Sequence, residues 1–352
     1  MTKPKLHHFV PRFLLRRFSA EPDAENPRLH HLDKGTGKCS VRGVRGEAAI
    51  AGYNDLREME GVPQEFAEHT LALVEDEAAS VVANLVEGRA LDQTQRMAMA
   101  LFLYLQYHRT PRGRQWFTYA FEQAYTLDAM RRLLDPREVQ ELHRLQGEEL
   151  SLEEAERRGR VWANHLDSGE LILKASHDHA VAAMFMFAEG VVPRIAAQMS
   201  WVILHAPSDL DFVVSDHPIL IHDPQAAPGY GAGWLSSPET VATCPLDRTC
   251  ALVASPGPPD LRHAEADQGD VEEINLRTYA SAEWAIYGPS VAAVQRVRTL
   301  AKKQKHRVAS LVPAPPTIHI LEQQEGQAHI DRVERLRPAG PVRRRQEWPR
   351  WD

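Results

Sequence analysis

Cysteine is scarce in this chain of 352 residues, and the long apolar runs of membrane proteins are missing. The three cysteines, Cys39, Cys244 and Cys250, form no CxxC pair, which argues against a disulfide framework and against a thiolate zinc site. The best apolar stretch, residues 180–192, is shorter than the roughly 18 residues needed to cross a bilayer and contains Glu189. The sequence therefore predicts a soluble protein without a membrane partner.

Several signatures of nucleotide-binding proteins and hydrolases are also missing. The chain has no GxGxxG, P-loop or HExxH motif, no GxSxG elbow and no internal repeat. Its start carries charges but lacks the apolar run of about 7–15 residues that marks a secretory signal. Together with the few cysteines, this predicts a cytoplasmic location.

The composition that is present is ordinary for a globular protein, with 43% hydrophobic and 25% charged residues. The net charge is −7, but the charges are distributed unevenly along the chain: both ends are basic and the middle is acidic. The basic residues near the start are Lys3, Lys5, Arg12, Arg16 and Arg17, and those near the end are Arg332, Arg335, Arg337, Arg343, Arg344, Arg345 and Arg350. One interpretation is a set of solvated faces and a tail. The other is that the basic start attracts nucleic acid or another phosphate-bearing ligand.

The apolar pattern predicts a single α+β domain over residues 1–312. An N-terminal segment with a hairpin (1–62) precedes a helical zone (63–200) and a sheet zone (201–312). The last zone has short β-branched runs without crossover-length helices between them, which is typical of an antiparallel or mixed sheet. We therefore expect a helical middle segment packed with a mostly antiparallel or mixed sheet from the C-terminal third. Residues 313–352 are predicted to be a linker and basic tail.

Local signals place several element boundaries. The stretch "RLHHLDKGTGKCSVRGV" predicts two strands joined by a glycine-containing turn. Asp92 and Ser176 are predicted helix caps, and "SLEE" at 151–154 is a predicted capping box. Pro111 is expected to end the helix that begins near Asp92.

Four segments carry a resemblance to a known family. They are "HHFVPRFLLRRFS" at 7–19, "LQYHRTPR" at 105–112, "FVVSDHP" at 212–218 and "CPLDR" at 244–248. Together they resemble the bacterial DUF4238 family, a family of unknown function, over most of residues 5–290. The resemblance implies no activity. It suggests that the opening segment, the RTP segment and the SDHP turn belong to one domain and share one site.

Two adjacent histidines lie before Pro11 in the opening segment. Neighbouring side chains in an extended chain point to opposite sides. One histidine can therefore face a site while the other packs or hydrogen-bonds elsewhere. Of His7 and His8, we favour His8 as the inward one.

The SDHP turn contains the clearest acid. Asp216 follows an apolar run, and Pro218 keeps His217 extended. One interpretation is a turn in which the carboxylate accepts backbone N–H bonds. The other is a metal ligand or general base, with His217 as its neighbour.

The helical zone adds carboxylates and an arginine. Glu68 and Glu75 lie about 20° apart around a helix, on the border of its apolar stripe. Each can extend to solvent or reach into a cleft. Arg109, beside the RTP turn, can pair with Asp216 or Glu75 or can cap helix carbonyls. A buried pair of arginine and aspartate is itself a structural explanation for these motifs.

The first function class that fits these residues is a metal-dependent hydrolase of phosphodiesters, including nucleases. Mixed imidazole and carboxylate ligands suit Mn, Zn or Fe better than Mg alone, and a bound metal can activate water. The basic start would hold phosphate. The predicted catalytic residues are Asp216, His8 and Arg109, and the predicted metal ligands are His7, His8, Glu75, Asp216 and His217.

Two other classes stay open. In a non-catalytic binding or regulatory protein, His7, Arg109 and Asp216 would form a structural polar network that joins the N-terminus to the sheet. A serine or cysteine hydrolase is the least supported class, because no GxSxG elbow or Cys-His pattern is visible in the sequence.

Overall fold

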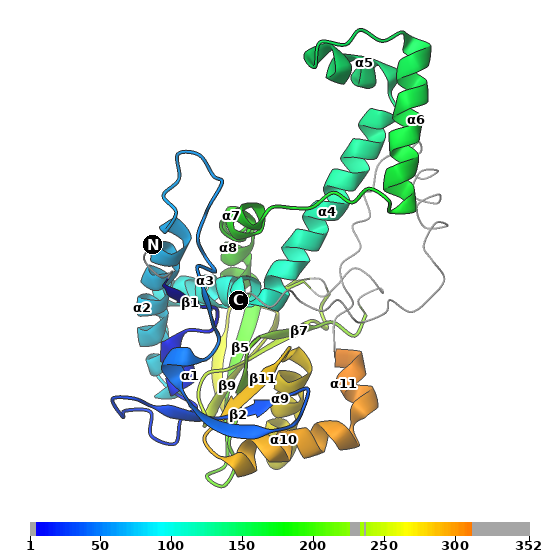
Figure 1. Ribbon diagram of the computed structural model, residues 1–352. Helices are drawn as coiled ribbons and strands as arrows, with labels where there is room; N and C mark the ends of the chain where they lie inside the picture. The colour runs from blue at the N-terminus through cyan, green and yellow to red at the C-terminus, as the bar shows by residue number, and fades with distance from the viewer. Residues whose placement is uncertain (1–4, 226–232, 236, 312–352) are drawn as a thin grey trace. The chain divides into compact units, whose positions relative to one another are not determined.

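Helices and mainly antiparallel strands build the computed structural model, which describes residues 5–225, 233–235 and 237–311 (Figure 1). The helical elements are α1 (Arg12–Arg16), η1 (Val44–Gly46), α2 (Phe66–Val86), α3 (Gln93–Arg109), α4 (Pro111–Leu133), α5 (Pro136–Leu145), α6 (Leu152–Ser168), α7 (His177–Met186), α8 (Ala188–Gln198), α9 (Gln268–Ser281), α10 (Val291–Lys303) and α11 (Lys305–Leu311). The strands are β1 (Leu6–His8), β2 (Arg28–Asp33), β3 (Cys39–Gly43), β4 (Ala49–Ala51), β5 (Met199–His205), β6 (Val214–Ser215), β7 (Leu220–His222), β8 (Val241–Pro245), β9 (Cys250–Pro256), β10 (Leu261–Glu265) and β11 (Ala285–Gly288). The predicted α+β class is confirmed.

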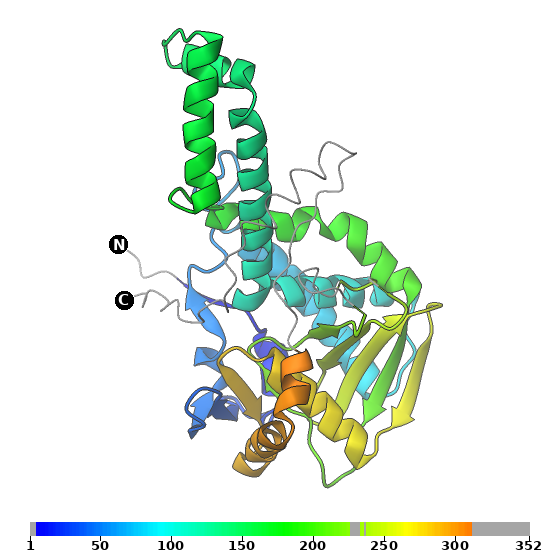
Figure 2. The same cartoon turned by 90° about the vertical axis from the view of Figure 1, so that its right-hand side faces the viewer.

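The described strands form three sheets. Their orders are β1-β4, β10-β5-β9-β8-β7 and β3-β2-β11-β6. The pair β10 and β5 is parallel, and the other pairs are antiparallel. Figure 2 shows strands of the five-stranded sheet side by side, coloured green to yellow.

We expect from the sequence that the C-terminal third forms the sheet, but the structure corrects this, because N-terminal strands also take part. The N-terminal hairpin supplies two of the strands in the four-stranded sheet, where His31 lies opposite Tyr287 and Ile286 lies opposite Ser215. Strand pairing joins residues that are distant in sequence. The apolar pattern of a strand therefore does not predict which other strand it will pair with.

The predicted local boundaries agree with the structure. β2 and β3 form the expected hairpin, and its turn contains Gly37 with φ of 74°, a left-handed conformation that glycine adopts without steric cost. Asp92 caps α3 in a capping box, and Ser151 and Ser176 accept hydrogen bonds at the starts of α6 and α7. The predicted capping box at 151–154 is only half formed, because the Glu154 side chain pairs with Arg157 and Arg158 instead of the Ser151 N–H. α3 ends just before Thr110, and α4 begins at Pro111.

A bend separates α7 from α8 within an apolar stretch of the chain. The two helices meet at 43°. Pro193 lies inside α8, so the break precedes the proline, whose ring disfavours a continuous helix through the turn before it. No single helix among the described residues has the length and apolarity to cross a membrane, although this bent pair passes that test as a pair.

The contacts divide the chain into two compact units. Described residues of the first lie within Met1–Phe121 and Lys174–Thr317, and those of the second within Glu122–Leu173. The predicted tail, 313–352, lies outside the described residues.

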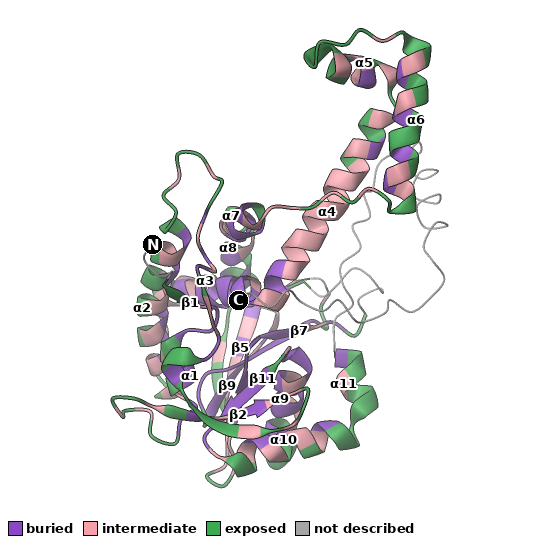
Figure 3. Cartoon of the chain, in the orientation of Figure 1, coloured by how far each residue is buried: buried purple, intermediate pink, exposed green. Residues whose placement is uncertain are grey.

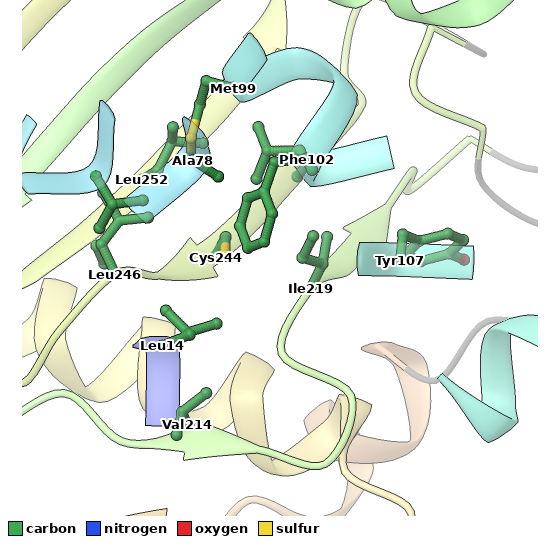
Figure 4. Close-up of a cluster of buried hydrophobic side chains, with 14 of the residues drawn as sticks. Leu14, Ala78, Met99, Phe102, Tyr107, Val214, Ile219, Cys244, Leu246 and Leu252 are labelled. Atoms are coloured by element: carbon green, nitrogen blue, oxygen red, sulfur yellow. The ribbon is translucent and has the colours of Figure 1, made fainter. Parts of the chain in front are cut away.

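The core of the first unit lies between α3, the five-stranded sheet and the N-terminal segment. Figure 4 shows Met99 and Phe102 from α3 near Cys244 and Leu252 of the sheet. Leu14 from α1 belongs to the same cluster. The start of the chain is therefore part of the core.

The second unit, which we call the arm, is a set of helices with little interior of its own. α5 and α6 pack through the buried residues Val139, Ala155 and Ala163. A Cβ on Gly159 would lie 2.1 Å from the carbonyl oxygen of Leu133, so only glycine permits this close packing. Exposed residues dominate the outer surface of α5 and α6 (Figure 3).

Candidate functional site

The junction between α3 and α4 contacts both the opening segment and the SDHP turn. Gln106, in the last turn of α3, donates a hydrogen bond of 3.0 Å to the carbonyl oxygen of Phe9. The hydroxyl of Thr110 lies 2.5 Å from Nδ1 of His217. Arg112 donates to the carbonyl oxygen of Ser281, at 2.6 Å. Segments far apart in the chain thus meet at residues 106–114, which we call the junction.

Arg109 is a buried arginine that pairs with Glu75. Its Nη1 donates to Glu75 at 2.5 Å, and its Nε donates to Gln106 at 2.8 Å. Only 2% of its side chain is exposed, against 25% of the Glu75 side chain. The buried Nη2 has no hydrogen-bond partner among the described residues. Of the two predicted partners for Arg109, the structure selects Glu75 and not Asp216.

Arg114 is a second buried arginine at the junction. It donates to the carbonyl oxygen of Tyr53 and to the Asn54 side chain, and its guanidinium lies 3.6 Å from the centre of the Tyr53 ring. Its buried Nε has no hydrogen-bond partner among the described residues, and Arg114 forms no ion pair with a described carboxylate. Burial lowers the pKa of Arg114, and the charge of Arg109 lowers it further.

His7, rather than His8, faces this cluster. The His7 ring is buried, and its Nδ1 accepts a hydrogen bond of 3.0 Å from the backbone N–H of Asn54. The bond places the proton of a neutral ring on Nε2, which lies 3.8 Å from Asp55 Oδ1. Glu68 lies 3.8 Å from Nδ1 and accepts a hydrogen bond of 2.5 Å from Asn54.

His8 lies on the opposite side of β1. It is half-buried, and its Nε2 lies 3.2 Å from the carbonyl oxygen of Arg45. Burial lowers its pKa, and the charges of Arg12 and Arg109 act in the same direction. The alternation of side chains along β1 explains why only one of the two histidines is fully buried.

Asp216 anchors the loop before β11. Its buried carboxylate accepts backbone N–H bonds from Glu283 at 2.8 Å, Trp284 at 2.6 Å and Ala285 at 3.0 Å. Burial raises its pKa, and the three N–H donors oppose that shift by favouring the charged form. No hydrogen bond or ion pair joins Asp216 to Arg109 in the described part of the chain. The carboxylate therefore accepts backbone N–H bonds, as in the structural interpretation, but the donors belong to a loop 67 to 69 positions away and not to the SDHP turn itself.

His217 is held next to the junction. Besides the contact with Thr110, its ring packs against that of Tyr107 with 5.1 Å between centroids. Burial holds the pKa of His217 well below its usual range. The ring is therefore neutral at physiological pH and accepts or donates a single hydrogen bond at Nδ1.

Glu283 is a residue that no sequence motif identified. Burial raises the pKa of this carboxyl to about 7, and the neighbouring Asp216 raises it further, against the charges of Arg112 and Lys34. Its Oε2 is buried and has no hydrogen-bond partner among the described residues. A half-buried carboxyl that titrates near neutral pH is a typical feature of functional sites.

The raised pKa of Glu283 leads to a testable pH dependence. Its ordinary pKa is 4.5, so between about pH 4.5 and 7 the folded chain holds a proton that the unfolded chain releases, and stability falls as pH rises. Glu283→Gln removes the free-energy cost of ionising this half-buried carboxyl in the folded protein. We expect the variant to match the wild type at pH 4 and to be more stable by about 1–2 kcal/mol at pH 8, because solvent screens part of the side chain.

Glu273→Gln is the matched control for that measurement by thermal unfolding. Burial opposes ionisation of Glu273, but hydrogen bonds from Arg277 and Arg307 together lower its pKa. Removing this carboxylate should therefore destabilise the protein at pH 8, which is the opposite sign. Equal pH profiles for wild type and Glu283→Gln would contradict the assignment.

Of the five predicted metal ligands, His8 lies apart on the opposite side of β1 from His7, and the other four fall into two groups. His7 and Glu75 lie with the arginines, whereas Asp216 and His217 lie with the loop before β11. Within residues 5–225, 233–235 and 237–311, no three His, Cys, Asp or Glu side chains are placed to hold a metal ion. The bound metal therefore stays a prediction.

A contact between cysteine and histidine exists that the sequence pattern did not reveal. Because β5 and β9 pair with His205 opposite Cys250, the Cys250 sulfur lies 3.2 Å from Nδ1 of His205. Nε2 of His205 lies 2.9 Å from His263. Burial raises the pKa of Cys250 to about 11, so the thiol is protonated at neutral pH and is a poor nucleophile.

A cavity of about 220 Å³ lies between α9, α10 and the loop at 209–211. Its polar lining includes Asp209, Asp211 and Arg296. None of the predicted catalytic or metal-binding residues lines it.

The chain matches a family model over most of its length. The family model described as "Protein of unknown function (DUF4238)" matches residues 6–290. No curated protein and no solved structure matches the chain. The matched range contains the opening segment, the junction and the SDHP turn.

Proposed function

Since the chain belongs to the DUF4238 family, a family of unknown function, we propose its function from the geometry of the junction: the protein binds a phosphate-bearing anion at Arg109 and Arg114. The observation that carries this proposal is the pair of buried guanidinium groups with unused donors, Nη2 of Arg109 and Nε of Arg114.

The charge balance of the junction supports an anionic ligand. Arg109 and Arg114 are close enough for one to lower the pKa of the other, yet Glu75 is the only carboxylate in a direct ion pair with either of them among the described residues. Keeping an unpaired charge buried costs several kcal/mol. An anion that shares the two guanidinium groups removes this cost.

A phosphate group suits two arginines better than a single carboxylate does. Its tetrahedral oxygens can accept from guanidinium groups that approach from different directions. Exposed Arg12 lies close enough to His8 to lower its pKa. Arg109 also lowers the pKa of His8, so Arg12 adds a positive charge in the neighbourhood of Arg109.

A second candidate is the phosphodiester hydrolase that the sequence predicted. The observation that favours it is Glu283, because a carboxyl with a pKa of about 7 can exchange protons with a substrate at neutral pH. Burial raises the pKa of Tyr53 to about 12, and Glu283 contributes to that shift. Glu283 is thus near the ring on which Arg114 stacks. Mn, Zn or Fe remains the proposed cofactor of this candidate.

The anion proposal is tested by thermal unfolding with inorganic pyrophosphate against chloride of equal ionic strength. A ligand at 100 times its Kd stabilises the folded state by about 2.7 kcal/mol, which corresponds to a Tm increase of roughly 5–10 °C. We expect this increase for the wild type and its loss in Arg114→Gln.

Arg96→Gln is the matched control variant. Arg96 also stacks on an aromatic ring, with 4.0 Å between its guanidinium and the Trp201 ring. All three of its guanidinium nitrogens donate to backbone carbonyl oxygens. This variant should lose stability but keep the response to pyrophosphate. An equal response in wild type and Arg114→Gln would refute the proposed site.

The hydrolase candidate needs a separate assay. DNA and RNA, single- and double-stranded, are incubated with the protein and with added Mn, Mg, Zn or Fe, against a chelated control. Metal-dependent cleavage that is lost in Glu283→Gln would support hydrolysis at the junction. Anion binding without cleavage of any of these substrates would leave the binding function alone.

A further inference from the structure

The tip of the arm presents apolar side chains beside unpaired acids. Leu142, Leu145 and Leu152 lie at the end of α5 and the start of α6, with exposed fractions of 41%, 74% and 54%. Glu149 and Glu153 are exposed next to them and form no hydrogen bond or ion pair in the described part of the chain. We call these five residues the tip patch.

Two features make the tip patch unusual for a solvated surface. The three leucines do not belong to any of the described apolar clusters, so burying them against a ligand would gain about 25 cal/mol per Å². The patch also combines two carboxylates that have no partner among the described residues with the C-terminal end of α5, where the helix dipole is negative. The basic side chains of that last turn, His143 and Arg144, are already paired with Glu148 and Glu141. The patch therefore suits a partner with positive charge and apolar bulk.

The last residues of this chain have that chemistry. The stretch "RRRQEWPRW" at 343–351 contains four arginines and two tryptophans and a single acid. Arginine pairs with carboxylates, and tryptophan buries a large apolar area against leucine. The 31 residues at 312–342 separate this stretch from Leu311, the last described residue, and an extended linker of that length spans up to about 100 Å.

We propose that residues 343–351 dock on the tip patch of the same chain. The tether favours this occupant over a free protein, because a linked segment experiences an effective concentration in the millimolar range. The acids of the patch also disfavour nucleic acid as its occupant, since they would repel phosphates.

Limited trypsin digestion of the full chain tests the docking. The rate of cleavage at Arg343, Arg344 and Arg345, followed by mass spectrometry, reports how often the segment is free. We expect the variant with Leu145→Ser, Glu149→Gln and Glu153→Gln to be cut at least about tenfold faster than the wild type, since a tenfold change in the open population corresponds to 1.4 kcal/mol at 25 °C. In 1 M salt the difference should shrink, because charge contacts are screened.

The control variant carries Leu73→Ser and Glu77→Gln. Leu73 is 59% exposed on α2, Glu77 is also exposed there, and their replacement should leave the cleavage rate unchanged. Equal rates in all three proteins would overturn the proposal. So would equal acceleration in both variants, because it would reflect general loss of stability.

Two further results of the digestion would overturn the proposal, one involving a second copy of the chain and one involving nucleic acid. Protection that rises with protein concentration, together with a dimer in light scattering that the tip variant lacks, would place the segment on a second copy and overturn docking within one chain. If the tip variant is cut as slowly as the wild type and only added DNA protects the segment, nucleic acid is its occupant and the proposal fails.

Discussion

Removal of residues 1–18 is expected to abolish cooperative unfolding. Phe9, Val10, Leu14, Leu15 and Phe18 are each at most 4% exposed and belong to the main apolar cluster. Fully burying a large apolar side chain contributes about 1.5–3 kcal/mol, so their joint loss is comparable with the 5–15 kcal/mol that stabilises a typical domain. Circular dichroism during heating is the measurement. A sharp transition within a few degrees of the wild type would show that the N-terminal segment is dispensable.

Point variants distinguish this packing from a nonspecific effect of truncation. Phe18→Ala should cost about 3–5 kcal/mol, because the ring is fully buried. Leu6→Ala is the control from the same segment, since 54% of Leu6 is exposed. Its effect should stay within about 0.5 kcal/mol.

Asp216→Asn is expected to destabilise the fold, because the carboxylate holds the loop before β11. Both carboxylate oxygens accept backbone N–H bonds, so an amide NH2 would face at least one donor. Leaving a buried donor unsatisfied costs about 1–3 kcal/mol, and more where a charged acceptor is lost. We expect a loss of about 2–4 kcal/mol in denaturant unfolding.

Asp209→Asn is the matched control for that substitution. Asp209 is exposed, and no hydrogen bond or ion pair to it is found in the described part of the chain. Its replacement should change stability by less than about 0.5 kcal/mol. If both variants unfold at the wild-type denaturant concentration, the three N–H bonds contribute nothing measurable and Asp216 must be assigned another role.

The candidate site was partly predictable from residue types. Arginine beside a helix end and a glutamate on the border of an apolar stripe identified Arg109 and Glu75, and the structure pairs them. The opening segment was also correctly expected to pack into the domain. The inward-facing histidine was predicted wrongly: it is His7 and not His8, because the orientation of β1 depends on its pairing with β4. Glu283 was missed because its environment comes from loops that sequence patterns do not connect.

The sequence by itself determined the local elements of this protein: the β2–β3 hairpin, the caps at Asp92, Ser151 and Ser176 and the helix end before Pro111. These depend on residues within about four positions of each other, whose backbone and side-chain chemistry acts in any context. Only the tertiary structure decided that Arg109 faces Glu75, 34 positions away, and that Asp216 binds the loop at Glu283, 67 positions away. Such contacts depend on how apolar surfaces pack and which strands pair, and no spacing along the chain encodes that choice.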